Sequence, residues 1–122
     1  MSGHPSAADL IEAVESFLRQ VEQRLQGREA FHAKVAANAL AIAVRELRQD
    51  PASVEAASLA ALLGADAGGA LPELRREACA RLRDGRLDAA TPGLVDALTA
   101  ATIAKLEVDN PRYATLERLR RE

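Results

Sequence analysis

The sequence predicts an all-α protein, a compact bundle of about five helices around a central helix rich in Ala and Leu. Apolar residues make up 48% of the 122 residues and recur at helical spacing. Only 2% of the residues are aromatic, whereas β-sandwich cores draw on aromatic and β-branched side chains. A chain of this length is expected to form a single helical domain, residues 1–122, with a flexible leader at 1–5 and a loosely ordered tail at 111–122.

The central helix is predicted from Phe31 to Leu47, in the stretch FHAKVAANALAIAVREL. This stretch contains no Gly or Pro and is rich in Ala and Leu, the strongest helix formers. From Val35 to Val44 every residue except Asn38 is apolar. Because a helix that is apolar nearly all round is a buried one, we expect neighbouring helices on most of its sides.

A first helix is predicted over residues 7–26. Ser6 and Asp9 resemble a capping box at its start, and Gly27 is placed to end it in the left-handed conformation. The short link at residues 27–28 makes this helix and the central helix an antiparallel hairpin. One apolar stripe runs along the first helix: Leu10, Ile11, Val14, Phe17, Leu18, Val21 and Leu25.

Three more helices are expected, over about residues 51–63, 71–84 and 93–108, followed by one or two frayed helical turns. Asp50-Pro51 and Thr91-Pro92 are cap-then-proline starts for the first and last of these helices. The apolar positions expected to face the core are Val54, Leu59, Leu62, Leu63, Leu71, Leu74, Ala78, Leu82, Leu94, Val95, Leu98, Ala101, Thr102 and Leu106, and Leu116 and Leu119 of the tail are available to dock.

Charge and cysteine content narrow the function classes. A net charge of −2 gives no electrostatic reason to expect nucleic acid. Cys79 is the single cysteine, so no internal disulfide is possible and a reducing compartment fits. The N-terminal residues lack the basic and apolar regions of a signal peptide, and no apolar stretch reaches the roughly 20 residues that span a bilayer. We therefore expect a cytoplasmic protein with no membrane contact.

Catalytic and metal-binding patterns are poorly supplied. One Cys and two His do not make a zinc site, and no phosphate-binding loop is present, so no metal, cofactor or catalytic residue is predicted and the chain is expected not to be an enzyme. Cys79 lies beside an apolar stripe and is interpreted as a packed small side chain. His32 is interpreted as bonded to a backbone carbonyl or to a neighbouring helix. The arginines at 75–86 alternate with acidic residues, which indicates a salt-bridged surface, with Glu77 and Arg81 as an i, i+4 pair.

The polar strip of the central helix is the best candidate for recognition. Lys34, Asn38 and Arg45 fall within an arc of roughly 60° on that helix. Asn38 either bonds a neighbouring helix, faces a partner together with the strip, or is merely solvated; a buried amide without a partner would cost about 1–3 kcal/mol. The predicted partner-binding residues are Phe31, Lys34, Asn38, Arg45 and Tyr113, with Ile42 along one edge.

With the later segments LRDGRLD and KLEVDNPRY, the central stretch resembles a bacterial family known mainly as a domain of unknown function. Its members are small helical proteins encoded beside a kinase that resembles aminoglycoside phosphotransferases and beside acyl-CoA dehydrogenases. In levulinate and 4-hydroxy acid catabolism, that kinase phosphorylates the 4-hydroxyl of a 4-hydroxyacyl-CoA. The resemblance extends from about residue 8 to 113 and includes the positions Phe31, His32, Val35, Asn38, Arg45, Glu46, Gly85, Asn110, Pro111 and Tyr113.

The resemblance implies a non-catalytic accessory subunit that binds a phosphotransferase-like kinase acting on acyl-CoA, and no catalytic residue carries over to this chain. The alternative is a self-associating helical structural protein, a homodimer without a kinase partner. A kinase gene next to the gene for this chain would favour the accessory subunit.

Overall fold

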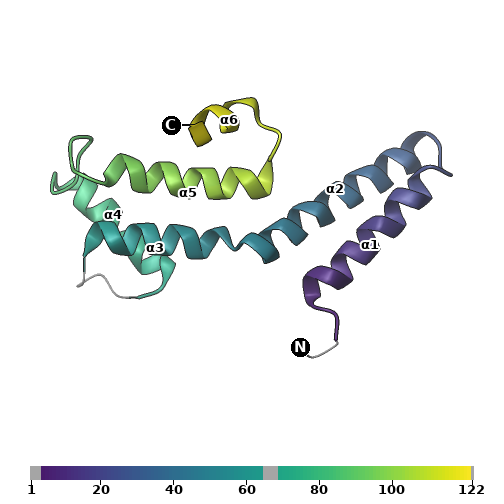
Figure 1. Ribbon diagram of the computed structural model, residues 1–122, viewed down its shortest axis with the longest axis horizontal. Coiled ribbons are helices and arrows are strands. Elements are labelled where there is room, and N and C mark those ends of the chain that lie inside the picture. Colours follow the sequence, from purple (N-terminus) through teal and green to yellow (C-terminus); the bar gives the residue numbers. More distant parts are fainter. Residues whose placement is uncertain (1–3, 65–68, 122) are drawn as a thin grey trace. The chain divides into compact units, whose positions relative to one another are not determined.

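The computed structural model describes residues 4–64 and 69–121. It confirms the all-α class, since helices and no strands are found in these two segments (Figure 1). The sixth helix lies in the predicted tail. The helices are α1 (Ala7–Glu22), α2 (Gly27–Gln49), α3 (Pro51–Leu63), α4 (Leu71–Arg83), α5 (Leu94–Asp109) and α6 (Ala114–Arg121).

Contacts between residues divide the chain into two compact units, Met1–Gln49 and Asp50–Glu122. The first unit contains α1 and α2, and the second contains α3 to α6. That the two units form a single domain stays a prediction. Within the described segments, no helix is both long enough and apolar enough to cross a membrane.

The first unit is the predicted antiparallel hairpin (Figure 1). Its capping box is confirmed: the Asp9 N–H donates to Ser6 Oγ and the Ser6 N–H donates to Asp9 Oδ2, both at 3.1 Å. Helix α1 ends four residues earlier than predicted, at Glu22. Gly27 has the expected left-handed backbone, with φ of 61°, but it is the first residue of α2 and not the residue that ends α1.

Small side chains form the contact between α1 and α2. The buried residues of the two helices are Ala8, Ala33, Ala37 and Val44. Within this two-helix unit α2 has one neighbour, so the expected burial on most of its sides is wrong there: Phe31, Val35 and Leu47 are exposed. Helix propensity and an apolar composition predict a helix correctly, but they do not supply the neighbours that would bury it.

Arg48 joins the two ends of the hairpin by ion pairs. Its guanidinium donates to Glu12 Oε2 at 3.0 Å and to Asp9 Oδ1 at 3.1 Å. The hydrogen bond from Arg48 and its positive charge lower the pKa of Glu12. The pKa of Asp9 is lowered chiefly by hydrogen bonds with Ser6 and then by Arg48.

These pKa directions predict a pH-dependent stability of the hairpin. A carboxyl group whose pKa is lower in the folded state stabilises that state above its unfolded pKa, 4.5 for Glu12, and the contribution is lost as the pH falls through the folded pKa. Thermal melts at pH 7 and pH 3 should therefore show a larger drop in Tm for the wild type than for Arg48→Ala. Arg28→Ala, which removes a charge at the opposite end of α2, should drop as the wild type does. An equal drop in all three proteins would contradict this role of Arg48.

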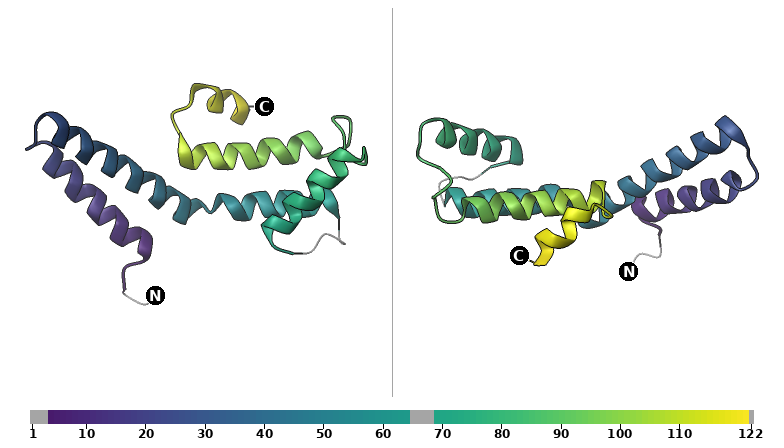
Figure 2. Two further views of the ribbon diagram at one scale, coloured as in Figure 1. Left: turned by 180° about the vertical axis from the view of Figure 1, so that it is seen from behind. Right: turned by 90° about the horizontal axis from the view of Figure 1, so that it is seen from above.

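The second unit has α3 and α5 side by side, with α4 packed on α3 and α6 on α5 (Figure 2). The predicted start of α3 is confirmed, since the Asp50 carboxylate accepts hydrogen bonds from the Ser53 N–H at 3.3 Å and the Ser53 hydroxyl at 2.6 Å. Asp50 has a left-handed backbone, with φ of 48°. The core cluster consists of Leu59, Leu63, Leu74, Ala78 and Leu87.

The turn after α4 brings Leu87 into this core. Gly85 follows the helix with φ of 84°, as its predicted role as a stop requires, and the Leu87 N–H donates to the Arg81 carbonyl at 2.9 Å. The prediction for Thr91 is wrong. Its hydroxyl accepts from the Asp88 N–H at 2.9 Å in a turn, and α5 is instead capped at Gly93, with φ of 87°.

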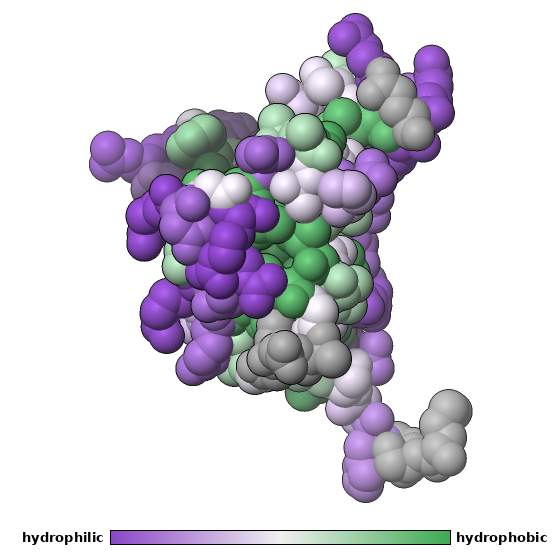
Figure 3. Space-filling model, turned by 90° about the vertical axis from the view of Figure 1, so that its left-hand side faces the viewer, coloured by the Kyte–Doolittle hydropathy of each residue, from purple (hydrophilic) through white to green (hydrophobic). Residues whose placement is uncertain are grey.

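Charged side chains cover the surface of the second unit as predicted. Arg81 pairs with Glu77 at 2.8 Å, and Arg75 binds Glu55 of α3 through two hydrogen bonds of 2.6 and 2.7 Å. Figure 3 shows hydrophilic side chains beside an area of exposed hydrophobic ones. The expected packing of Cys79 is wrong, because its side chain is exposed on α4.

Candidate partner-binding site

Four of the five predicted partner-binding residues lie on α2, and Tyr113 lies in the second unit, directly before α6. Lys34 and Asn38 are exposed, Arg45 is half-buried, and Phe31 exposes 62% of its surface. Tyr113 is 45% exposed. The α2 residues are therefore accessible along one helix, whose regular backbone fixes their spacing.

Asn38 is bonded to the neighbouring helix, one of the three alternatives that its position left open. Arg19 of α1 donates from Nη2 to Asn38 Oδ1 at 3.2 Å and from Nε to Glu15 Oε2 at 3.0 Å. The contact is made by a side chain and not by the backbone, and it lies at the protein surface. This chain of polar groups holds the amide in place while leaving it accessible.

Apolar side chains flank this polar strip on α2. At about 100° per residue, Phe31, Lys34, Val35 and Asn38 fall within an arc of about 100°. Val35 exposes 48% of its surface, and the Phe31 ring lies 6.0 Å from the ring of His32. His32 is itself exposed, in contrast to the bonded histidine that was expected. We call Phe31, Lys34, Val35 and Asn38 the α2 surface; Ile42, the expected edge residue, is partly buried.

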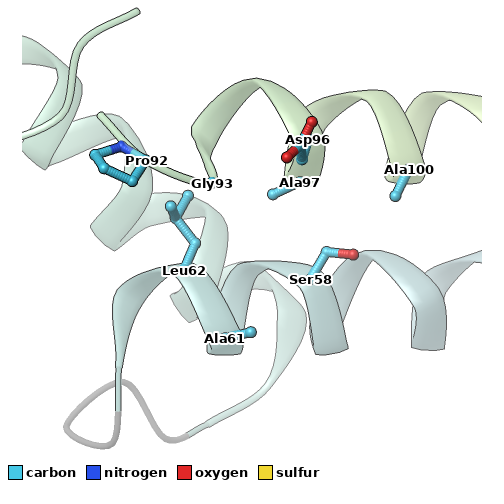
Figure 4. A pocket seen from close by; sticks show the side chains of 8 residues that line it. All are labelled: Ser58, Ala61, Leu62, Pro92, Gly93, Asp96, Ala97 and Ala100. Atoms are coloured by element: carbon cyan, nitrogen blue, oxygen red, sulfur yellow. The ribbon is translucent and has the colours of Figure 1, made fainter. Parts of the chain in front are cut away.

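The sequence did not indicate a groove between α3 and α5, which has a volume of about 360 Å³. Leu62 of α3 points toward α5, while Ala97 and Ala100 of α5 point toward α3 (Figure 4). Asp96 is the only ionisable residue of the lining, so the groove has no acid–base pair. Its other residues are Ser58, Ala61, Pro92 and Gly93. Small residues are read from sequence as helix formers or turns, which is why the groove could not be foreseen.

No group of three or more His, Cys, Asp or Glu side chains in the described segments could hold a metal ion. The arrangement that remains is a set of accessible side chains on a helix, suited to contact with another macromolecule.

Comparison with known proteins gives one match. No curated protein and no solved structure matches the chain. A model of DUF6285, a domain of unknown function, matches residues 23–113, which agrees with the expected resemblance to a family of unknown function. The match covers most of the chain, so the protein belongs to the DUF6285 family.

Proposed function

We propose that the chain is a non-catalytic accessory subunit in the cytoplasm, which binds a kinase that resembles aminoglycoside phosphotransferases and acts on acyl-CoA substrates of 4-hydroxy acid catabolism. The observation that carries the binding role is the α2 surface, where exposed Phe31 and Val35 lie beside exposed Lys34 and Asn38.

The make-up of this surface fits a protein partner. Non-obligate interfaces combine apolar and polar area, and aromatic residues are enriched in them. A phenylalanine that is 62% exposed can become largely buried when a partner covers it. Asn38 can serve the partner with its free amide hydrogens, since the printed bond from Arg19 uses its carbonyl oxygen.

The choice of a kinase as partner rests on the resemblance of the stretch from Phe31 to Leu47, and this stretch forms most of α2. The motif that carries the resemblance and the accessible side chains therefore occur on the same helix. Arg45 belongs to the motif, but it is half-buried, so we expect Phe31 to contribute more to binding than Arg45.

The test is the affinity of the chain for the kinase encoded next to it, measured by isothermal titration calorimetry after co-expression has shown a complex. Phe31→Ala is expected to weaken binding by about 1–3 kcal/mol, since aromatic side chains dominate such interfaces. Its Tm should change little, because the ring is exposed in the free protein.

Phe17→Ala is the matched control, because Phe17 is also 62% exposed but lies on α1. We expect it to bind the kinase as the wild type does. The proposal fails if no complex forms, or if Phe31→Ala and Asn38→Ala bind the kinase with unchanged affinity. A loss of Tm in Asn38→Ala with unchanged affinity would show that the Arg19 contact serves only the hairpin.

A further inference from the structure

Helix α1 exposes a row of large apolar side chains that the hairpin does not cover. Leu10, Val14 and Phe17 expose 56%, 51% and 62% of their surface. Their spacing of four and three residues places them along one line of the helix. A contiguous row of this kind marks an interaction site more often than single exposed residues do.

The hairpin has a polar side and an apolar side. Arg48 bonds Asp9 and Glu12, and Arg19 bonds Asn38, all on the polar side. On a helical projection, the row on α1 and Leu47 of α2, which is 53% exposed, lie away from these contacts. Phe31 and Val35 project from the outer flank of α2, so the α2 surface and this apolar side are distinct.

The hairpin buries little of its own. Three alanines and one valine are its buried residues, so its large apolar side chains contribute little to the contact between α1 and α2. Four-helix bundles bury such side chains by packing two antiparallel helix pairs face to face. We propose that a second copy of this chain covers the apolar side, so that two hairpins form a four-helix bundle about a two-fold axis near Phe17.

The charges along α1 favour a second copy as the occupant. A two-fold interface brings the same patch together in opposite directions, so the start of one α1 meets the end of the other. Asp9 lies in the first turn and Arg24 in the turn after the helix, which gives these ends opposite charges. Near the axis, the neighbouring flank carries only the uncharged Ala13, Ser16 and Gln20. No like charges therefore oppose each other at the centre.

The size of the hairpin face also fits. The 16 residues of α1 give it a length of about 24 Å, and two adjacent helices are about 20 Å wide. The corrugated surface of such a face is of the same order as the roughly 800 Å² that each partner buries in a stable interface.

The test is sedimentation equilibrium of the full chain, without any kinase, over 1–100 μM. The wild type is expected to be a dimer, and Phe17→Glu is expected to be a monomer because it places two carboxylates near the axis. Phe31→Glu is the matched control: Phe31 is equally exposed but lies outside the proposed interface, so this variant should stay a dimer. Circular dichroism of the variants checks that both keep the helix content of a folded chain.

A monomeric wild type at 100 μM overturns the proposal, and so does a Phe17→Glu variant that remains a dimer. Dissociation of both variants would move the interface to another surface and overturn it as well. If Phe17→Glu loses its helices, Val14→Ser, which removes apolar area without adding charge, must raise the dimer dissociation constant at least tenfold; an unchanged constant overturns the proposal. The outcome is independent of kinase binding, which depends on the α2 surface.

Discussion

Replacing Leu74 with alanine is expected to lower the free energy of unfolding of the second unit by about 2–5 kcal/mol, the usual cost of truncating a buried leucine. Leu74 is 3% exposed and belongs to the cluster with Leu59, Leu63 and Leu87. The cavity would open where α3, α4 and the turn after α4 meet. Urea unfolding monitored by circular dichroism measures the change.

Leu82→Ala is the control on the same helix. Leu82 is 43% exposed, so the same truncation removes far less buried surface and should cost well under half as much as Leu74→Ala. Equal losses for the two variants would mean that α4 packs on the unit through a different face.

Leu116→Ala is expected to cost about 2–5 kcal/mol, although it lies only a few residues from the end of the chain. Its side chain is fully buried, as is that of Val108. The sequence led to the opposite order, with a large cost at Leu40 or Ile42 of the central helix and a small one in the tail. That order is wrong for the described structure, because Leu40 and Ile42 are only partly buried.

The same urea experiment on Leu40→Ala and Leu116→Ala decides between the two orders. Leu98→Ala, which truncates a 46% exposed side chain of α5, provides the baseline. A loss for Leu116→Ala no larger than that baseline would show that α6 contributes little to the stability of the unit.

Helix starts and stops that depend on a few adjacent residues could be predicted from sequence. The capping box at Ser6, the cap at Asp50 and the stop at Gly85 are all found, since each involves hydrogen bonds or backbone angles within one turn. Thr91 shows the limit of this reasoning. Its hydroxyl can bond Asp88 as easily as it can cap a helix, and residue types alone do not choose between two local hydrogen bonds.

Burial was harder to predict than helix content, because it depends on which elements meet. The apolar stripe of α1 reads as a core face, yet Leu10, Val14 and Phe17 are exposed. Leu116 reads as part of a charged tail, yet it is buried. For the candidate site, the sequence identified the strip on α2 but not the Arg19 contact of Asn38, which pairs residues 19 positions apart.

The bounds of the family match have a consequence for how far these findings can be transferred. The match begins at residue 23, one residue after α1 ends, and stops at residue 113, one residue before α6 begins. Phe31 lies inside the matched range, whereas Leu10, Val14 and Phe17 lie outside it. Membership of the family therefore carries the segment proposed to bind the kinase, but not the one proposed to pair two copies. Dimerisation would have to be measured anew in each relative.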